Sequence, residues 1–272
     1  MTPDLEELEF DLVLEAVQRR FGYDFRGYAR PSLKRRLRNL VEEAQVPSLS
    51  HLLPRLLHED AYIDHFVNRI SVPTTALFRH AQTLDAMREI VFPVLRTYGY
   101  AKVWLAGCST GEEVYSVAIL LEEAGLLDRV QIYATDISTR ALAVARDGIY
   151  RLEALKAAEA DYAEAGGTRQ LRDYYLASYG SAKFAERLGR RIVFSQHNLV
   201  TDAVFGEMHL VLCRNVLIYF GRQLQQHVIR LLHASLVRRG FLLLGAKEML
   251  QHVDGQRHFE PVKAEAHLFR AL

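Results

Sequence analysis

The stretch from Val103 to Glu113, VWLAGCSTGEE, constrains the fold more than any other part of the chain. A short apolar run leads into a loop of small residues with two glycines, and EEVYSVAILLEEAG then has a strongly helical composition. Small residues let the backbone approach a ligand closely, and the N–H groups at the start of a helix can point toward it. This pattern predicts the strand-to-helix turn of an α/β domain that binds a nucleotide-like cofactor.

Further short apolar runs follow through the second half of the chain. They lie at residues 103–106, 130–135, 192–194, 210–213 and 241–244, mostly separated by helical stretches. This alternation predicts a parallel sheet with helices on both faces. Residues 258–272 can close the sheet with two more strands. The rhythm is lost between Tyr150 and Arg190, so that segment is predicted to be either an insertion in the sheet or a small subdomain.

The first part of the chain has a different pattern, because its apolar residues recur at helical spacing and strand patterns are absent. Leu12, Leu14 and Val17 show this spacing, and Pro31 suits the first turn of a helix. We predict an all-α N-terminal domain of about four short helices at residues 1–75. A linker and an amphipathic helix at 76–100 then lead to the α/β domain at 101–272.

Composition excludes several functional classes. A formal charge of +1 over 272 residues argues against a protein that binds polyanions with its whole surface. Cys108 and Cys213 are too few and too far apart for a disulfide framework or a zinc site. Pro54 interrupts any helix that could align His51 with His58, so no metal site is expected. Without a signal pattern or an apolar run of about 20 residues, we expect a cytoplasmic protein with no membrane insertion.

An acid follows the glycine loop at the spacing of a ribose-binding residue. Asp136 ends the next apolar run, about 25 residues beyond the loop, where a carboxylate can accept hydrogen bonds from ribose hydroxyls. Two alternatives remain open. GCSTG also fits the nucleophile elbow of an α/β-hydrolase with Ser109 as nucleophile, which would need a later histidine such as His252 or His258. The loop could also be a tight turn without a ligand.

Several co-linear strings in the second half resemble one known family. AGCSTGEEVYS, YATDIS, FSQHNL and above all LCRNVLIYF are similar to the chemotaxis-receptor glutamate methyltransferases of the CheR family, and YARPSLKRRL is similar to that family's helical domain. The resemblance implies an S-adenosylmethionine-dependent methyltransferase with a Rossmann-like domain at 101–272. It also implies a small β-subdomain insertion at 151–195 and a preceding all-α domain. The product would be S-adenosylhomocysteine.

The family's functional residues carry over where this sequence matches its motifs. The resemblance implies that Arg79 and Tyr219 are catalytic. The residues implied to bind the cofactor are Thr75, Arg79, Glu113, Asp136, Asn198, Leu199, Asn215 and Val216.

The chemistry agrees with these residue types. Methyl transfer to a carboxylate is an in-line displacement, and a glutamate is already ionised near neutral pH, so no strong general base is needed. The protein must mainly align the reactants. Arg79 can hold a carboxylate and Tyr219 can donate a hydrogen bond to the attacking oxygen. Without the resemblance, Arg79 is more simply a surface arginine at a helix cap, and Tyr219 could be a core residue.

A basic segment in the helical part suggests a partner. Residues 26–38 contain six basic residues and no acid. Taken alone, this is most simply a solvated helix face, and no motif for nucleic acid accompanies it. The resemblance implies contact with the acidic methylation region of the cytoplasmic helical bundle of chemotaxis receptors. We expect a monomer that acts without nucleic acid.

The chain departs from the family pattern at a few positions. Pro73 replaces a usual asparagine and removes a backbone donor, and Lys247 stands in a stretch that often reads GHSE or GSSE in the family. These departures keep open a catalytically silent, cofactor-binding scaffold. The stretch LASYGSAKFAERLGRRIVF matches the shorter form of the β-subdomain, so no dependence on a receptor's pentapeptide tether is expected.

Overall fold

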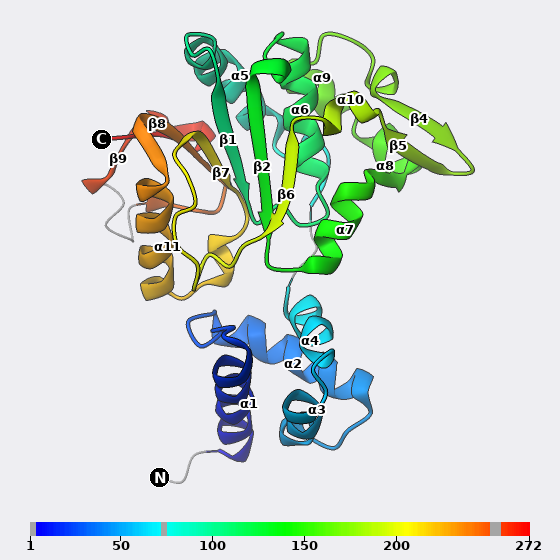
Figure 1. The fold of residues 1–272 in the computed structure, drawn as a ribbon, viewed down its shortest axis with the longest axis vertical. Helices are drawn as coiled ribbons and strands as arrows, with labels where there is room; N and C mark the ends of the chain where they lie inside the picture. The colour runs from blue at the N-terminus through cyan, green and yellow to red at the C-terminus, as the bar shows by residue number, and fades with distance from the viewer. Residues whose placement is uncertain (1–3, 72–74, 251–256) are drawn as a thin grey trace.

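The helical first part of the chain forms a domain of its own, as the apolar spacing predicts. In the computed structural model, which describes residues 4–71, 75–250 and 257–272, four α-helices precede residue 72. They are α1 (Leu5–Phe21), α2 (Arg30–Ala44), α3 (Leu53–His58) and α4 (Tyr62–Ile70), with a short 3-10 helix, η1 (Leu49–Leu52), before α3. Phe10, Leu37 and Phe66 are fully buried in their common core. Figure 1 shows this domain below the larger α/β domain.

The second part is built on a mixed seven-stranded sheet with the strand order β6-β2-β1-β7-β8-β10-β9. The first five strands in this order are parallel, and β10 runs antiparallel to both of its neighbours. The predicted α/β fold with a closing strand pair is therefore confirmed. The strands are β1 (Ala101–Ala106), β2 (Val130–Asp136), β6 (Ile192–Gln196), β7 (Met208–Cys213), β8 (Leu236–Leu244), β9 (Phe259–Lys263) and β10 (Leu268–Ala271).

Helices cover both faces of the sheet because alternate strand residues point to opposite sides. Val103 and Leu105 belong to the core shared with α5 (Ala81–Leu95) and α6 (Glu112–Glu123). Trp104 lies on the other face, in the core shared with α11 (Arg222–Ala234). α7 (Thr139–Asp147) packs near β2 and β6 and also contacts α4 of the helical domain. No described helix has both the length and the apolar character that a bilayer crossing requires.

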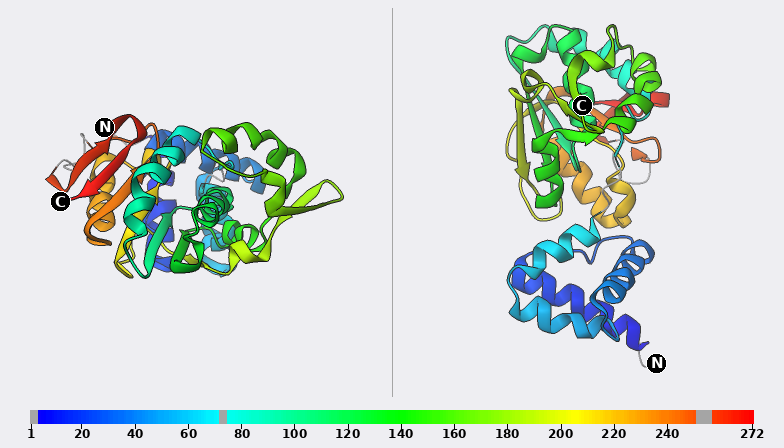
Figure 2. Two further views of the ribbon diagram at one scale, coloured as in Figure 1. Left: turned by 90° about the horizontal axis from the view of Figure 1, so that it is seen from above. Right: turned by 90° about the vertical axis from the view of Figure 1, so that its right-hand side faces the viewer.

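The segment where the rhythm is lost forms a small β-subdomain, of which the hairpin of β4 and β5 projects from the molecule (Figures 1 and 2). Tyr179 and Gly180 join these two strands, and both have positive φ, as a type I′ hairpin turn requires. The subdomain contains β3 (Ile149–Arg151), α8 (Leu152–Ala157), α9 (Glu159–Glu164), η3 (Leu171–Tyr174), β4 (Tyr175–Ser178), β5 (Ser181–Phe184) and α10 (Glu186–Gly189).

The two domains are joined by backbone hydrogen bonds. The Ala29 N–H donates to the carbonyl of Tyr219 at 2.8 Å, and the Gly221 N–H donates to the carbonyl of Gly27 at 2.7 Å. Between them, Tyr28 and Phe220 form an antiparallel bridge, and their rings meet edge to face with centroids 5.0 Å apart. The loop before α2 is therefore attached to the segment that carries Tyr219.

We expect Thr135→Val to lower the free energy of unfolding by about 1–3 kcal/mol, because it leaves a buried donor without a partner. The fully buried Trp104 indole N–H donates to the Thr135 hydroxyl at 2.9 Å. Urea denaturation measures the loss. Thr97→Val is the matched control, since Thr97 is exposed and should change stability by no more than about 0.5 kcal/mol. Equal losses in both variants would contradict the expectation.

Candidate functional site

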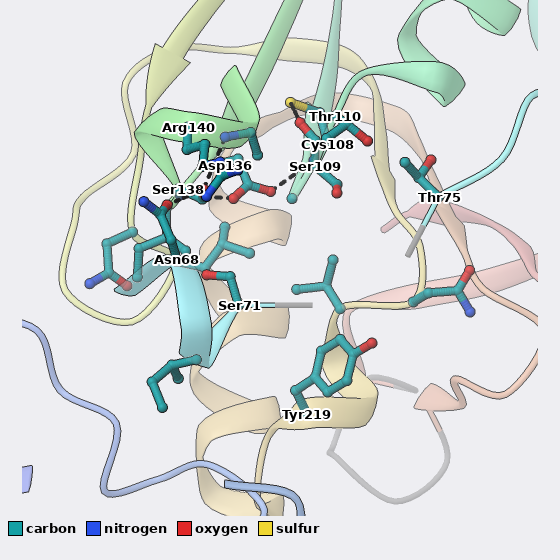
Figure 3. A pocket seen from close by; sticks show the side chains of 18 of the residues that line it. Asn68, Ser71, Thr75, Cys108, Ser109, Thr110, Asp136, Ser138, Arg140 and Tyr219 are labelled. Atoms are coloured by element: carbon teal, nitrogen blue, oxygen red, sulfur yellow. Dashed lines mark hydrogen bonds between the residues drawn. The ribbon is translucent and has the colours of Figure 1, made fainter. Parts of the chain in front are cut away.

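A cavity of about 460 Å³ opens at the carboxyl ends of β1, β2, β6 and β7, against the helical domain. The strand order reverses at β1, and crevices at such points are the usual ligand sites of open α/β sheets. Figure 3 shows Asp136 and Tyr219 on opposite sides of the cavity, with Thr75 at a third. The structure brings every predicted site residue to its lining: Thr75, Arg79, Glu113, Asp136, Asn198, Leu199, Asn215, Val216 and Tyr219.

The glycine loop is held against the end of β2 and against the loop after β7. The N–H groups of Gly107 and Cys108 both donate to the carbonyl of Thr135, at 2.8 and 2.9 Å. Gly107 has a φ of +76°, and a Cβ there would lie 2.5 Å from a methyl group of Val216. Glycine is therefore required at this position for both conformation and space.

Asp136 fastens two loops and still borders the cavity. One of its carboxylate oxygens accepts the Ser109 N–H at 2.8 Å, and the other accepts the Ser138 N–H at 2.9 Å. Burial raises the pKa of Asp136, while these backbone donors oppose the rise. Each oxygen has a further lone pair for a ligand hydroxyl.

The turn after β6 presents one polar and one apolar side chain to the cavity. The Asn198 side-chain carbonyl accepts the Val200 N–H at 3.0 Å, and the Asn198 N–H donates to Asp202 at 2.8 Å. These bonds fix the turn. Leu199 is 7% exposed and supplies an apolar wall of the kind that a flat aromatic base packs against.

Arg214 was missed by sequence reasoning, although it connects three of the site's segments. It is 6% exposed, forms an ion pair with Glu113 at the start of α6, and donates to the carbonyl of Arg79 at 2.7 Å. Arg79 itself lies between Phe78 and His80, which both have positive φ and so form a strained turn. The available signal was a charged residue directly after a buried strand, the same signal that singled out Asn215.

Tyr219 is reached by a residue of the helical domain. The Arg36 guanidinium, from α2, lies 4.8 Å from the centre of the Tyr219 ring and also donates to the carbonyl of Ile70. Sequence reasoning had placed Arg36 only within the basic segment. The structure makes it a wall of the cavity.

The charge of the rest of the basic segment is largely compensated by acids, most of which lie on α1. Arg30 pairs with Glu7 and Asp11, Lys34 pairs with Glu7, Arg38 pairs with Glu6, and Arg26 pairs with Asp24 and Glu15. Arg35 is exposed and takes part in no ion pair within the described ranges. The part of the segment that carries unpaired positive charge is therefore smaller than its sequence implies.

The hydrolase alternative is wrong. The Ser109 hydroxyl is buried and has no hydrogen-bond partner among the described residues, so no base is in place to activate it. His258 instead lies beside His233, with ring centroids 4.8 Å apart, and His252 lies outside the described residues. Burial raises the pKa of Cys108 and Cys213, which fits packed rather than reactive thiols.

The two departures from the family pattern have different outcomes. Pro73 lies outside the described residues. Lys247 is exposed and is not among the residues that line the cavity. No group of three or more potential metal ligands occurs in the described part of the chain.

Known proteins resemble the chain over almost its whole length. Residues 8–71 match the family model described as CheR methyltransferase, all-alpha domain, and residues 73–267 match CheR methyltransferase, SAM binding domain. A Pseudomonas putida protein named Cher3 is 42% identical over 264 residues, with 97% of each chain covered. Chemotaxis protein methyltransferases of Listeria monocytogenes and Escherichia coli are 30% and 29% identical, covering 92% of this chain and 93% and 87% of their own.

The residues that line the cavity fit S-adenosylmethionine, the ligand that the family description names. The Asp136 carboxylate suits ribose hydroxyls, and Leu199 and Val216 offer apolar surface to a base. At the other end, Glu113 and Arg79 offer opposite charges to an amino acid moiety. The volume lies within the usual range for pockets of small ligands, roughly 300–1,000 Å³.

We expect Asp136→Asn to weaken binding of S-adenosylhomocysteine by about 10–100-fold, because hydrogen bonds to a charged acceptor are lost. Isothermal titration calorimetry measures the affinity. Asp147→Asn is the control, because Asp147 is exposed at the far end of α7 and does not line the cavity. Unchanged affinity in Asp136→Asn would remove this residue from the cofactor site.

Proposed function

Because this chain belongs to the CheR methyltransferase family, we propose that it methylates glutamate side chains of chemotaxis receptors, giving glutamate methyl esters. The chain is a methyltransferase that uses S-adenosylmethionine, and S-adenosylhomocysteine would be the second product. The observation that carries the proposal is that Arg79 and Tyr219, which can hold a carboxylate, border the same cavity as Asp136.

We assign the predicted site residues to binding of the cofactor and to binding of the acceptor, with Arg79 serving both. Thr75, Arg79 and Glu113 would hold the methionyl end of the cofactor, and Asp136 would hold the ribose. Asn198, Leu199, Asn215 and Val216 would surround the adenine. Arg79 and Tyr219 would act on the acceptor.

The proposed chemistry requires alignment more than proton transfer. The cofactor supplies a methyl group activated by a sulfonium. A glutamate acceptor is ionised near neutral pH, so the protein needs no strong base. Arg79 would hold the carboxylate, and the Tyr219 hydroxyl would orient its attacking oxygen.

We further propose that the partner is the cytoplasmic helical bundle of the receptors and that the protein acts in the cytoplasm as a monomer. The name chemotaxis protein methyltransferase in relatives supports a receptor partner. The exposed Arg35 and the neighbouring cavity wall at Arg36 supply positive charge for an acidic surface. The two-residue turn between β4 and β5 supports the absence of a tether requirement.

We propose domain limits of 1–75, 76–100 and 101–272. The insertion, expected at 151–195, instead runs from β3 (Ile149–Arg151) to α10 (Glu186–Gly189), because β6 (Ile192–Gln196) belongs to the main sheet. The end of α4 at Ile70 and the start of β1 at Ala101 support these limits. A catalytically silent scaffold is not favoured, because Arg79, Asp136 and Tyr219 all border the cavity.

We expect Arg79→Ala and Tyr219→Phe each to slow labelled methyl transfer to receptor-containing membranes by about 10–100-fold, because each removes a proposed hydrogen bond to the acceptor. Scintillation counting of the receptor measures the rate. Arg96→Ala is the control, because Arg96 contacts the carbonyl of Ala124 away from the cavity. If wild-type protein binds S-adenosylhomocysteine yet labels no receptor, the proposal is wrong.

We expect Arg35→Glu to raise the KM for receptor by about tenfold at low salt and to leave the affinity for S-adenosylhomocysteine unchanged. An exposed charge at a protein–protein contact mainly changes the rate at which the two proteins associate. Added salt should shrink the difference from wild type. Lys156→Glu is the matched control, an exposed charge reversal on α8. A receptor KM that is insensitive to both salt and Arg35→Glu would rule out this contact. Arg36 is unsuitable for this test because it packs on Tyr219.

A further inference from the structure

Glu248, just beyond the end of β8, is a buried carboxylate that does not line the cavity. Glu248 is only 3% exposed. One oxygen accepts the N–H groups of Asn215 and Gly245, at 2.9 and 2.6 Å. The other accepts those of Val216 and Leu217, at 2.8 and 2.7 Å. Two strand ends are therefore tied together through one carboxylate.

The hydrogen bonds to backbone N–H groups occupy the Glu248 carboxylate almost completely. A carboxylate has about four lone-pair positions, and here four backbone N–H groups use them. Burial raises the pKa of Glu248 while the four donors oppose the rise. The packing is also close, because a Cβ on Gly245 would lie 2.7 Å from a Glu248 oxygen and 2.8 Å from the Asn215 nitrogen.

The backbone that Glu248 holds is the one that presents the site. Asn215 has a φ of +60°, a left-handed conformation that asparagine tolerates better than other residues with a side chain, and Glu248 accepts its N–H. Three of the four N–H groups bound by Glu248 belong to Asn215, Val216 and Leu217, where the chain enters η4 (Leu217–Tyr219). Within this turn the Tyr219 N–H donates to the carbonyl of Val216 at 3.1 Å. Val216 in turn packs against Gly107.

We propose that Glu248 is a positioning residue for methyl transfer. Its carboxylate fixes the position of the loop that presents Asn215, Val216 and Tyr219 to the cavity. It touches neither cofactor nor acceptor and acts through that loop. The part that concerns Tyr219 rests on the proposed function above, whereas the part that concerns Asn215 and Val216 requires only that the cofactor binds.

The test is Glu248→Gln, which keeps the shape of the side chain but turns one acceptor into a donor facing two N–H groups. We expect kcat to fall by at least about tenfold and the affinity for S-adenosylhomocysteine to weaken by a few-fold or more. Circular dichroism shows whether each variant is folded at the assay temperature. Glu248→Asp retains the charge with a shorter reach, so it should fold and show an intermediate kcat.

Glu123→Gln is the matched control for a merely structural role. Glu123 is a carboxylate outside the cavity that accepts hydrogen bonds from the hydroxyls of Tyr162 and Tyr174 and from the Thr168 N–H. Its amide variant should lower the midpoint of thermal unfolding without changing kcat or affinity. A wild-type kcat in Glu248→Gln, or an equal fall of kcat in Glu123→Gln, would overturn the proposal.

The two proposals fail in distinguishable ways. Affinity for S-adenosylhomocysteine does not depend on the acceptor, so it reports on Glu248 even if receptors are not the substrate. Weakened affinity in Glu248→Gln with unchanged affinity in Glu123→Gln supports positioning. Failure of the wild type to label receptors counts against the acceptor alone.

Discussion

The buried guanidinium of Arg214 is the interaction on which the arrangement of the site depends. A charge withdrawn from water is tolerated only when it is paired and hydrogen-bonded, and removal of one partner from such a pair typically costs about 3–5 kcal/mol. Here the partners are the Glu113 carboxylate and the carbonyl of Arg79. Because they come from α6 and from the turn before α5, satisfying one charge brings three separate segments to a single cavity.

The loop after β7 is held from both of its sides in this way. Arg214 faces α6 and the turn at Arg79, while the next three residues donate their N–H groups to Glu248. A methyl transfer to an ionised carboxylate gains little from acid–base catalysis and much from fixed geometry. Rigid support for an irregular loop is therefore the contribution that the α/β domain can make to such a reaction.

The helical domain is also part of the cavity and not only a neighbour of it. Its loop before α2 is hydrogen-bonded to the segment 219–221, and Arg36 lies over the Tyr219 ring. Meanwhile most other cations of α2 are paired with acids of α1. Among the cations of α2, Arg36 therefore lines the cavity, and Arg35 is left exposed without an ion pair among the described residues.

Outside residues 150–190, sequence alone determined the alternation of strands and helices, and it also identified the glycine loop and the acid at Asp136. These features depend on local periodicity and on short spacings along the chain. The resemblance to a family then supplied the other predicted site residues. Only the tertiary structure revealed Arg214, Glu248 and the position of Arg36, since each acts on a partner that is 31 or more residues away. The same reason explains the basic segment. Residues 26–38 contain no acid, but α1 folds against them and neutralises most of their charge, and the distance in sequence between a charge and its counter-ion cannot be read from composition.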